Sequence, residues 1–268
     1  MEESGFRGRR RRRGRRRSDR RRAVFLLPNL VTSAALLLGY GSIIASIHQD
    51  FERAALFIVL AGICDMLDGR IARATNTTSA FGVEYDSLAD LISFGLAPSL
   101  LMYNWLLEPL GRRGWLLAAL FALCAALRLA RFNVKAAQGD LSWYQGVPST
   151  FAGGMIAATV WFVTWIGYAP PFGRPVGTLL TTLFVALALL MVSTLPYPSL
   201  KLVRTDGRRA YPTLVAVLLL TIALLLNHEW MFFALGLAFI VSGPLIWVYR
   251  RATRRGTPET PAPEKPHV

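Results

Sequence analysis

Long runs of apolar residues constrain this chain more than any other feature of its sequence. The runs are roughly 18–22 residues long, which is enough for a helix to cross about 30 Å of hydrocarbon. Hydrophobic residues make up 53% of the 268 residues. Soluble proteins approach a similar share, so the distribution of these residues decides the class rather than their fraction. The sequence therefore predicts an all-α integral membrane protein.

Eight membrane-spanning helices can be drawn between polar breaks such as HQD, EPLGRRG, GYAPPFGRP and NHE, which are typical of loops. A cleaved signal peptide is an alternative for the first helix. Its apolar run is about twenty residues long, whereas a signal peptide has 7–15, so we interpret it as a retained span. The expected spans are about 25–47, 51–73, 84–107, 114–134, 147–167, 176–196, 211–227 and 230–249.

Two strongly biased segments flank the expected transmembrane catalytic domain, residues 24–250. Residues 1–23 contain RGRRRRRGRRRSDRRR, and like charge at this density predicts a disordered tail. Beside a membrane span such a tail attracts anionic lipid. RNA binding is the alternative, but we expect no specific nucleic acid. Residues 251–268 are polar and Pro-rich, so a second disordered tail is expected there.

The distribution of basic residues predicts the orientation of the chain. With the N-terminus in the cytoplasm and eight spans, 26 of the 30 Lys and Arg residues fall on the cytoplasmic side. Without the N-terminal tail the split is still 14 to 4. Because cytoplasmic loops carry an excess of Lys and Arg, we expect both termini in the cytoplasm and a multi-pass protein of the cell membrane.

Four aspartates occur within the stretch DMLDGRIARATNTTSAFGVEYDSLAD, residues 65–90. Asp65 and Asp68 are three residues apart near the cytoplasmic end of the second span, and Asp86 and Asp90 are four apart near the start of the third. Each pair therefore shares one helix face. Carboxylates gathered in one pocket repel each other and lose hydration, so they are stable together when divalent cations lie among them. Oxygen ligands suit Mg²⁺ or Mn²⁺, and the two cysteines are not spaced as zinc ligands.

Small and basic residues lie between the two aspartate pairs. Gly69 and Ala72 lie one turn beyond the first pair and leave room for a substrate to approach the helix. Arg73 continues the same stripe, and its guanidinium could bind a phosphate. Gly82 would let the chain pass close to a ligand. This combination suits a pyrophosphate better than a proton relay.

Nine residues over 26 positions follow a fixed spacing, Asp65-x2-Asp68-Gly69-x2-Ala72-Arg73-x8-Gly82-x3-Asp86-x3-Asp90. This spacing resembles, without departure at any fixed position, the signature of the CDP-alcohol phosphotransferase family of membrane enzymes. The resemblance implies a homodimer whose subunits have a six-helix core and a cytoplasm-facing cavity with two divalent cations. It also implies transfer of a phosphatidyl or similar group from a CDP-linked lipid to an alcohol, with release of CMP.

The resemblance also implies roles for individual residues. Asp65, Asp68 and Asp86 would bind the metal ions, while Asp90 would lie close to the metals and act as the base that accepts the proton of the attacking hydroxyl. Gly69, Ala72, Arg73 and Gly82 would shape the CDP-lipid site. To this site we add three further candidates, Asn29 and Thr32 beside Pro28 and Ser79 of the hydroxyl-rich loop TNTTS.

Four other stretches resemble the membrane-embedded phosphatidylserine synthases of that family, namely LPNLVTSAALLLGYGSI, ALRLARFNV, GVPSTFAGG and LMVSTLPYPSLK. The donor would then be CDP-diacylglycerol and the acceptor L-serine, whose carboxylate requires a cation. Arg128, Arg131 and Lys135 are the candidates for this cation, with Asn133 as a polar partner. Ordinary positive-inside anchoring is the alternative role for the two arginines.

Other functions stay open at this point. A cation-coupled transporter would also need buried carboxylates, but those usually lie near the membrane midplane on broken helices related by a repeat. A membrane prenyltransferase spreads its aspartates over distant helices, whereas one hairpin carries all four here. Within the family, glycerol 3-phosphate, inositol phosphate and choline-type acceptors are the alternatives to serine. A purely structural role would leave the arginines and glycines of the motif unexplained.

Overall fold

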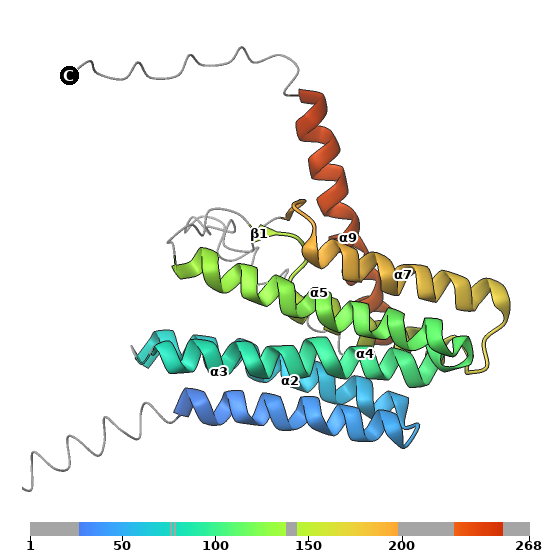
Figure 1. The fold of residues 1–268 in the computed structure, drawn as a ribbon, viewed down its shortest axis with the longest axis horizontal. Helices are drawn as coiled ribbons and strands as arrows, with labels where there is room; N and C mark the ends of the chain where they lie inside the picture. Colours follow the sequence, from blue (N-terminus) through green and yellow to red (C-terminus); the bar gives the residue numbers. More distant parts are fainter. Residues whose placement is uncertain (1–26, 76, 78, 138–143, 198–227, 254–268) are drawn as a thin grey trace, which may run out of the picture.

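The computed structural model describes residues 27–75, 77, 79–137, 144–197 and 228–253. Long helices lie roughly side by side through most of the molecule, and the C-terminal helix leaves the others at an angle (Figure 1). The expected tail at residues 1–23 and the expected seventh span at 211–227 lie outside the described residues. The expected C-terminal tail begins at 251, but the last helix continues to Thr253.

The described helices follow one another along the chain, and the stretches 138–143 and 198–227 between them lie outside the described residues. In order they are a first helix (Leu27–Ile47), α2 (Phe51–Thr75), α3 (Ala80–Asp90), η1 (Leu91–Leu96), α4 (Ala97–Met102), η2 (Tyr103–Leu107), η3 (Glu108–Leu110), α5 (Arg112–Ala137), α6 (Ser149–Trp165), α7 (Arg174–Val192) and α9 (His228–Thr253).

The helices confirm an all-α membrane protein. Four of those described are long and apolar enough to cross a bilayer: Leu27–Ile47, Arg112–Lys135, Arg174–Val192 and Trp230–Tyr249. Helix α2 carries the first aspartate pair and three arginines, and α6 has 17 residues. Composition and length alone therefore do not mark these two helices as spans. The helical segments nevertheless coincide with every expected span that falls on described residues.

The segment from α3 to η3 is continuous but not uniform. Two π-helical turns, η1 and η2, interrupt it, and η1 begins directly after Asp90. Such turns are rare and frequently occur at functional sites. Within η1, Ser93 is buried, and its hydroxyl donates to the carbonyl of Ala35 at 3.0 Å. A Cβ added to Gly39 would lie 2.5 Å from Ser93 Oγ, so the first helix and η1 approach each other closely.

Aromatic and small side chains form the core between the helices. Helix α2 packs against α6, α5 against α7, and α6 against α9. Phe121 of α5 stacks on Phe184 of α7 with ring centroids 4.8 Å apart, and both rings are fully buried. On the other side, Phe162 of α6 stacks on Phe233 of α9 at 4.4 Å. These contacts hold α6 in the interior of the bundle.

A short antiparallel ladder fixes the start of α6. Strand β1 (Tyr144–Gln145) pairs with β2 (Pro196–Tyr197), which follows α7. Gly146 has a φ of +78°, a region that favours glycine, and the backbone N–H of Val147 donates to the carbonyl of Leu190 at 3.1 Å. With two residues in each strand the ladder leaves the fold class unchanged. It anchors the N-terminus of α6 beside the C-terminal end of α7.

Candidate active site

Three of the four motif aspartates converge between α2 and α3. Asp65 and Asp68 project from α2 and Asp86 from α3, and one carboxylate oxygen of each lies within 4.8 Å of the others. Asp68 is buried, with 4% of its surface exposed, and the other two are partly buried. The helix periodicity that places Asp65 and Asp68 on one face of α2 thus directs both carboxylates at α3.

Asp90 lies next to this trio rather than within it. Its carboxyl group is within hydrogen-bonding reach of the Asp65 carboxyl, and the charges of Asp86 and Asp68 also act on it. One helical turn of α3 separates Asp90 from Asp86. The four carboxyl groups therefore form one connected cluster in which Asp65 is the link to Asp90.

The donor set fits hard divalent cations. All the clustered donor atoms are carboxylate oxygens, which Mg²⁺ and Mn²⁺ prefer. Of the histidines in the described residues, His48 lies just before α2, far from Asp65 along the helix, and His228 is the first residue of α9. Carboxylates this close repel each other when they are buried or partly buried. Bound cations would offset this repulsion.

Thr32 of the first helix supports Asp68. Its Oγ1 lies 2.7 Å from Asp68 Oδ2 and 3.1 Å from the carbonyl oxygen of Pro28. Because Thr32 is 4% exposed, this hydroxyl is buried together with the carboxylate. The sequence predicts Thr32 in the CDP-lipid site, whereas the structure brings it against a candidate metal ligand.

Candidate CDP-lipid residues gather at the start of α3. Ser79 is the N-cap of this helix, and its Oγ accepts from the backbone N–H of Gly82 at 3.0 Å. A Cβ added to Gly82 would lie 3.2 Å from Ser79 Oγ and 3.5 Å from Asn29 Oδ1, so these three residues are neighbours. In this part of the site the hydroxyls of Ser33 and Tyr85 also lie 2.8 Å apart. The sequence analysis did not select either of them.

The other motif residues line the last turns of α2. The Arg73 guanidinium folds back over Gly69, because a Cβ on Gly69 would lie 3.5 Å from Arg73 Nη1. Arg73 is exposed and Ala72 is partly buried. The arginine therefore lies over the glycine on this face of α2.

Arg128, one of the four candidate acceptor residues, lies close enough to the carboxylate cluster for its charge to act there. Its positive charge acts on both Asp65 and Asp90. Its Nη1 donates to Ser149 Oγ at 2.9 Å, and the guanidinium lies over the Phe132 ring at 5.6 Å. The neighbouring Thr150 donates to Asp65 Oδ2 at 3.5 Å.

The remaining three candidates lie further along α5. Arg131 Nη1 donates to the carbonyl of Val192 at the end of α7, at 3.0 Å. The amide of Asn133 donates to Ser87 Oγ of α3 at 2.9 Å. Lys135 is partly buried and lies seven residues beyond Arg128, about 10 Å along the helix. The contacts of Arg131 with Val192 and of Asn133 with Ser87 thus tie α5 to neighbouring helices.

Ser149 and Thr150 are functional candidates that the sequence analysis missed. Both belong to GVPSTFAGG, a stretch recognised for its similarity but without assigned roles. The signal in the sequence for these two candidates was a pair of hydroxyl residues that directly follows Pro148 at the start of an apolar run. Their partners lie 21 and 85 residues away in sequence, so spacing alone could not reveal the contacts.

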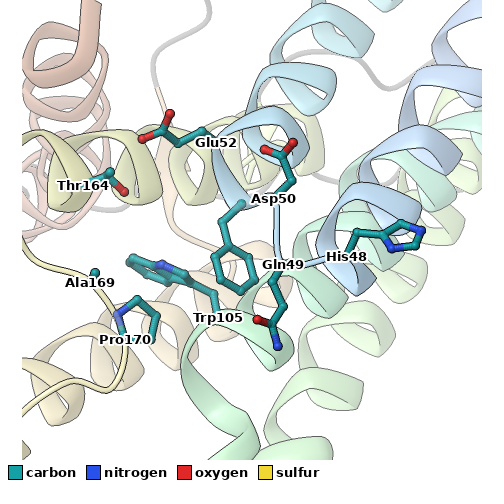
Figure 2. A pocket seen from close by; sticks show the side chains of 9 residues that line it. His48, Gln49, Asp50, Glu52, Trp105, Thr164, Ala169 and Pro170 are labelled. Carbon is teal, nitrogen blue, oxygen red and sulfur yellow. The ribbon is translucent and has the colours of Figure 1, made fainter.

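A separate pocket lies at the other end of the bundle. It has a volume of about 450 Å³ and is lined by His48, Gln49, Asp50, Phe51, Glu52, Trp105, Thr164, Ala169 and Pro170. Figure 2 shows the ring of Trp105 next to Pro170 in this pocket. Phe51 precedes Asp65 by 14 residues of α2, or about 21 Å. The pocket is therefore not part of the carboxylate site.

Comparison with known proteins identifies the relatives of this chain. Residues 25–195 match the family model described as CDP-alcohol phosphatidyltransferase. The CDP-diacylglycerol–serine O-phosphatidyltransferase of Helicobacter pylori is 34% identical over 226 residues, which are 84% of this chain and 92% of that protein. The Bacillus subtilis protein of the same name is 37% identical over 127 residues, covering 47% and 71% of the two chains.

An archaeal relative extends the comparison. The archaetidylserine synthase of Methanothermobacter thermautotrophicus is 33% identical over 186 residues, which are 69% of this chain and 72% of that protein. The matched family region contains the whole aspartate motif, both helices that carry it and the Arg128–Ser149 contact. Motif, clustered carboxylates and relatives agree, and the chain belongs to the CDP-alcohol phosphatidyltransferase family.

Proposed function

We propose that this enzyme transfers the phosphatidyl group of CDP-diacylglycerol to L-serine, forming phosphatidylserine and CMP. The cluster of Asp65, Asp68 and Asp86 carries the proposal, because three buried or partly buried carboxylates within 4.8 Å suit a metal-assisted reaction on a pyrophosphate. Serine as the acceptor is supported by the names of the bacterial relatives and of the archaetidylserine synthase.

In the proposed reaction the serine hydroxyl oxygen attacks the phosphorus that bears the diacylglycerol group. A new P–O bond forms to serine, and the P–O bond to CMP breaks. Asp90 accepts the hydroxyl proton, since it adjoins the trio through Asp65 without belonging to it. A general base of this kind typically contributes a factor of about 10²–10⁴ to the rate.

Asp65, Asp68, Asp86 and Asp90 would hold two divalent cations, Mg²⁺ or Mn²⁺. When bound, these cations neutralise the diphosphate and stabilise the attacking and leaving oxygens of an in-line displacement. Thr32 would hold the Asp68 carboxylate in place through its 2.7 Å contact. A hydrogen bond of this kind orients a metal-binding side chain toward the metal.

Binding of the two substrates is divided between the two sides of the cluster. We assign the CDP-lipid to Asn29, Ser79, Gly82 and the Gly69–Arg73 face of α2, including Ala72, because these residues border the cluster at the start of α3. We assign the serine carboxylate to Arg128, on the α5 side. Arg131, Asn133 and Lys135 then help to hold α5 or to extend the acceptor site.

The membrane arrangement forms part of the proposal. Eight spans with both termini in the cytoplasm would place the aspartate cluster at the cytoplasmic face of the cell membrane, in agreement with the excess of basic residues expected there. We further propose a homodimer, as the family resemblance implies. The arginine-rich segment at 1–23 would contact anionic lipid.

Release of CMP by the purified full-length protein tests the activity. The protein is supplied with CDP-diacylglycerol, Mn²⁺ or Mg²⁺, and one acceptor at a time: L-serine, glycerol 3-phosphate or inositol phosphate. The proposal predicts release that depends on L-serine. Release that depends on a phosphorylated acceptor instead would keep the family chemistry and contradict the assignment of serine.

A further inference from the structure

We propose that Ser149 is a positioning residue that fixes the Arg128 guanidinium for the carboxylate of the acceptor. The inference rests on the proposed function, in which Arg128 binds L-serine. Ser149 belongs to α6 and is therefore separate from the aspartate motif and from the basic residues of α5. Ser149 would act on catalysis through Arg128 and not by touching the reacting atoms.

Ser149 is built into the protein as a fixed acceptor. It is the first residue of α6 and is fully buried, at 0% exposure. Its Oγ accepts from Arg128 Nη1 at 2.9 Å, a good distance for a hydrogen bond from a charged donor. The β1–β2 ladder and the bond from the Val147 N–H to the Leu190 carbonyl come just before this turn of α6, so backbone pairing fixes the main chain from which the hydroxyl projects.

The contact fixes Arg128 relative to the reacting centre. The guanidinium is supported by the Phe132 ring of its own helix at 5.6 Å and by Ser149 of α6, and its charge acts on Asp65 and Asp90. The next residue, Thr150, contacts Asp65 Oδ2 at 3.5 Å. One turn of α6 therefore touches both the acceptor-side cation and a candidate metal ligand.

The small size of L-serine makes the position of the Arg128 guanidinium important. Its carboxylate and hydroxyl are separated by only two carbon atoms, so the place where the carboxylate binds determines where the hydroxyl oxygen lies. A displacement of about 1 Å at the reacting atoms can reduce a rate by about a hundredfold. A guanidinium has five N–H donors in a rigid fork, so a bond to Ser149 is compatible with binding of a carboxylate by the same group.

The other basic and polar candidates have different roles in this arrangement. Arg131 donates to the carbonyl of Val192 and Asn133 to Ser87, and both contacts join α5 to another helix. Arg128 is instead joined to the start of α6 beside Asp65. The Arg128–Ser149 pair therefore combines a cation, a buried partner and proximity to the carboxylate cluster.

A double-mutant cycle with Ser149→Ala and Arg128→Gln tests the inference. CMP release is measured while L-serine and CDP-diacylglycerol are varied separately. Ser149→Ala should raise the KM for L-serine about tenfold, the order expected when a charged group loses a hydrogen bond, and change the KM for CDP-diacylglycerol less than about twofold. Added to Arg128→Gln, it should have little further effect, because its partner is already absent.

Three further variants exclude a general structural effect. Ser149→Thr keeps the hydroxyl and should restore the KM for L-serine to within about threefold of wild type. Thr159→Ala removes another buried hydroxyl of α6, which bonds only the carbonyl of Met155 in its own helix, and should leave both KM values unchanged. If Ser149→Ala gives too little folded protein, Ser149→Cys replaces it, with a side chain of similar size and a weaker acceptor.

The outcomes separate this inference from the proposed function. An unchanged KM for L-serine in Ser149→Ala, or effects that multiply in the double variant, would overturn the positioning role while leaving Arg128 as the serine-binding residue. If Arg128→Gln raised the KM for CDP-diacylglycerol and not that for L-serine, the assignment of Arg128 would fail and the positioning role with it. A wild-type enzyme that used only another alcohol would refute the proposed acceptor before any variant was measured.

Discussion

Asp90 is the residue at which the proposed chemistry can be tested with the smallest change. Asp90→Asn removes the proton acceptor but keeps the size of the side chain. Turnover should fall about a hundredfold or more, while binding of CDP-diacylglycerol, measured by titration, stays close to wild type. Glu84→Gln is the matched control, because Glu84 is an exposed carboxylate of the same helix. Normal turnover in Asp90→Asn would show that Asp90 is not the base.

Asp65 and Thr32 should differ in their effects on metal binding. Asp65→Asn removes a ligand, and Thr32→Val removes the hydroxyl that lies 2.7 Å from Asp68 Oδ2. Loss of a ligand's hydrogen-bond partner typically costs about 10–100-fold in metal affinity or activity. We therefore expect Thr32→Val to weaken Mn²⁺ binding about tenfold and Asp65→Asn to weaken it more, as measured by calorimetry.

The control for this pair is Thr178→Val, because Thr178 is an exposed residue of α7 whose hydroxyl bonds only the carbonyl of Arg174. An equal loss of Mn²⁺ affinity in the control would mean that Thr32 has no special relation to the metal site. Unchanged affinity in Asp65→Asn would contradict its assignment as a ligand.

The sequence predicted the aspartates of the candidate site but not the contacts that Thr32 and Thr150 make with them. The aspartates were predictable because helix periodicity places Asp65 with Asp68 and Asp86 with Asp90, and the structure brings Asp65, Asp68 and Asp86 together. The contact of Thr32 with Asp68 joins residues 36 positions apart, and that of Thr150 with Asp65 joins residues 85 positions apart. Such contacts depend on how separate helices pack, which no local spacing contains.

At the level of elements, the first helix closely approaches η1, which begins directly after Asp90. A Cβ on Gly39 would lie 2.5 Å from Ser93 Oγ and 2.7 Å from its Cα. Gly39→Ala should therefore force these helices apart and lower the free energy of unfolding by about 1–3 kcal/mol. Thermal unfolding in detergent would show this as a lower melting temperature.

Gly154 of α6 provides the comparison for that experiment. A Cβ added there meets nothing within 4 Å, and alanine is a better helix former than glycine. Gly154→Ala should therefore leave the melting temperature unchanged or raise it slightly. A similar loss of stability in both variants would show that helix composition, and not the approach to Ser93, explains the result.

The helical elements themselves were largely predictable. Apolar runs between polar breaks located the first helix, α5, α7 and α9 to within a few residues, because each run has to satisfy its backbone groups within the segment. The π-helical turns after Asp90 and Met102 were not predictable. Each involves one extra residue per turn, and nothing in the apolar pattern of LISFGL or YNWLL marks that change.

At the level of the whole molecule, the charged N-terminal segment and the catalytic residues are separate in sequence. The twelve arginines at residues 7–22 all precede the first helix. Removing residues 1–20 should leave serine-dependent CMP release by the purified protein within about twofold of the full chain. Complete loss of activity in protein that is inserted and folded would show that the segment contributes to the site.

Transfer of labelled L-serine into extractable lipid by the purified protein tests the central claim most directly. The measurement is made with CDP-diacylglycerol over a titration of Mn²⁺, for wild type and for Asp86→Asn. We predict labelled lipid that requires the cation in wild type and falls about a hundredfold or more in Asp86→Asn, because Asp86 belongs to the carboxylate trio. Transfer that needs no divalent cation, or that survives Asp86→Asn unchanged, would contradict the account.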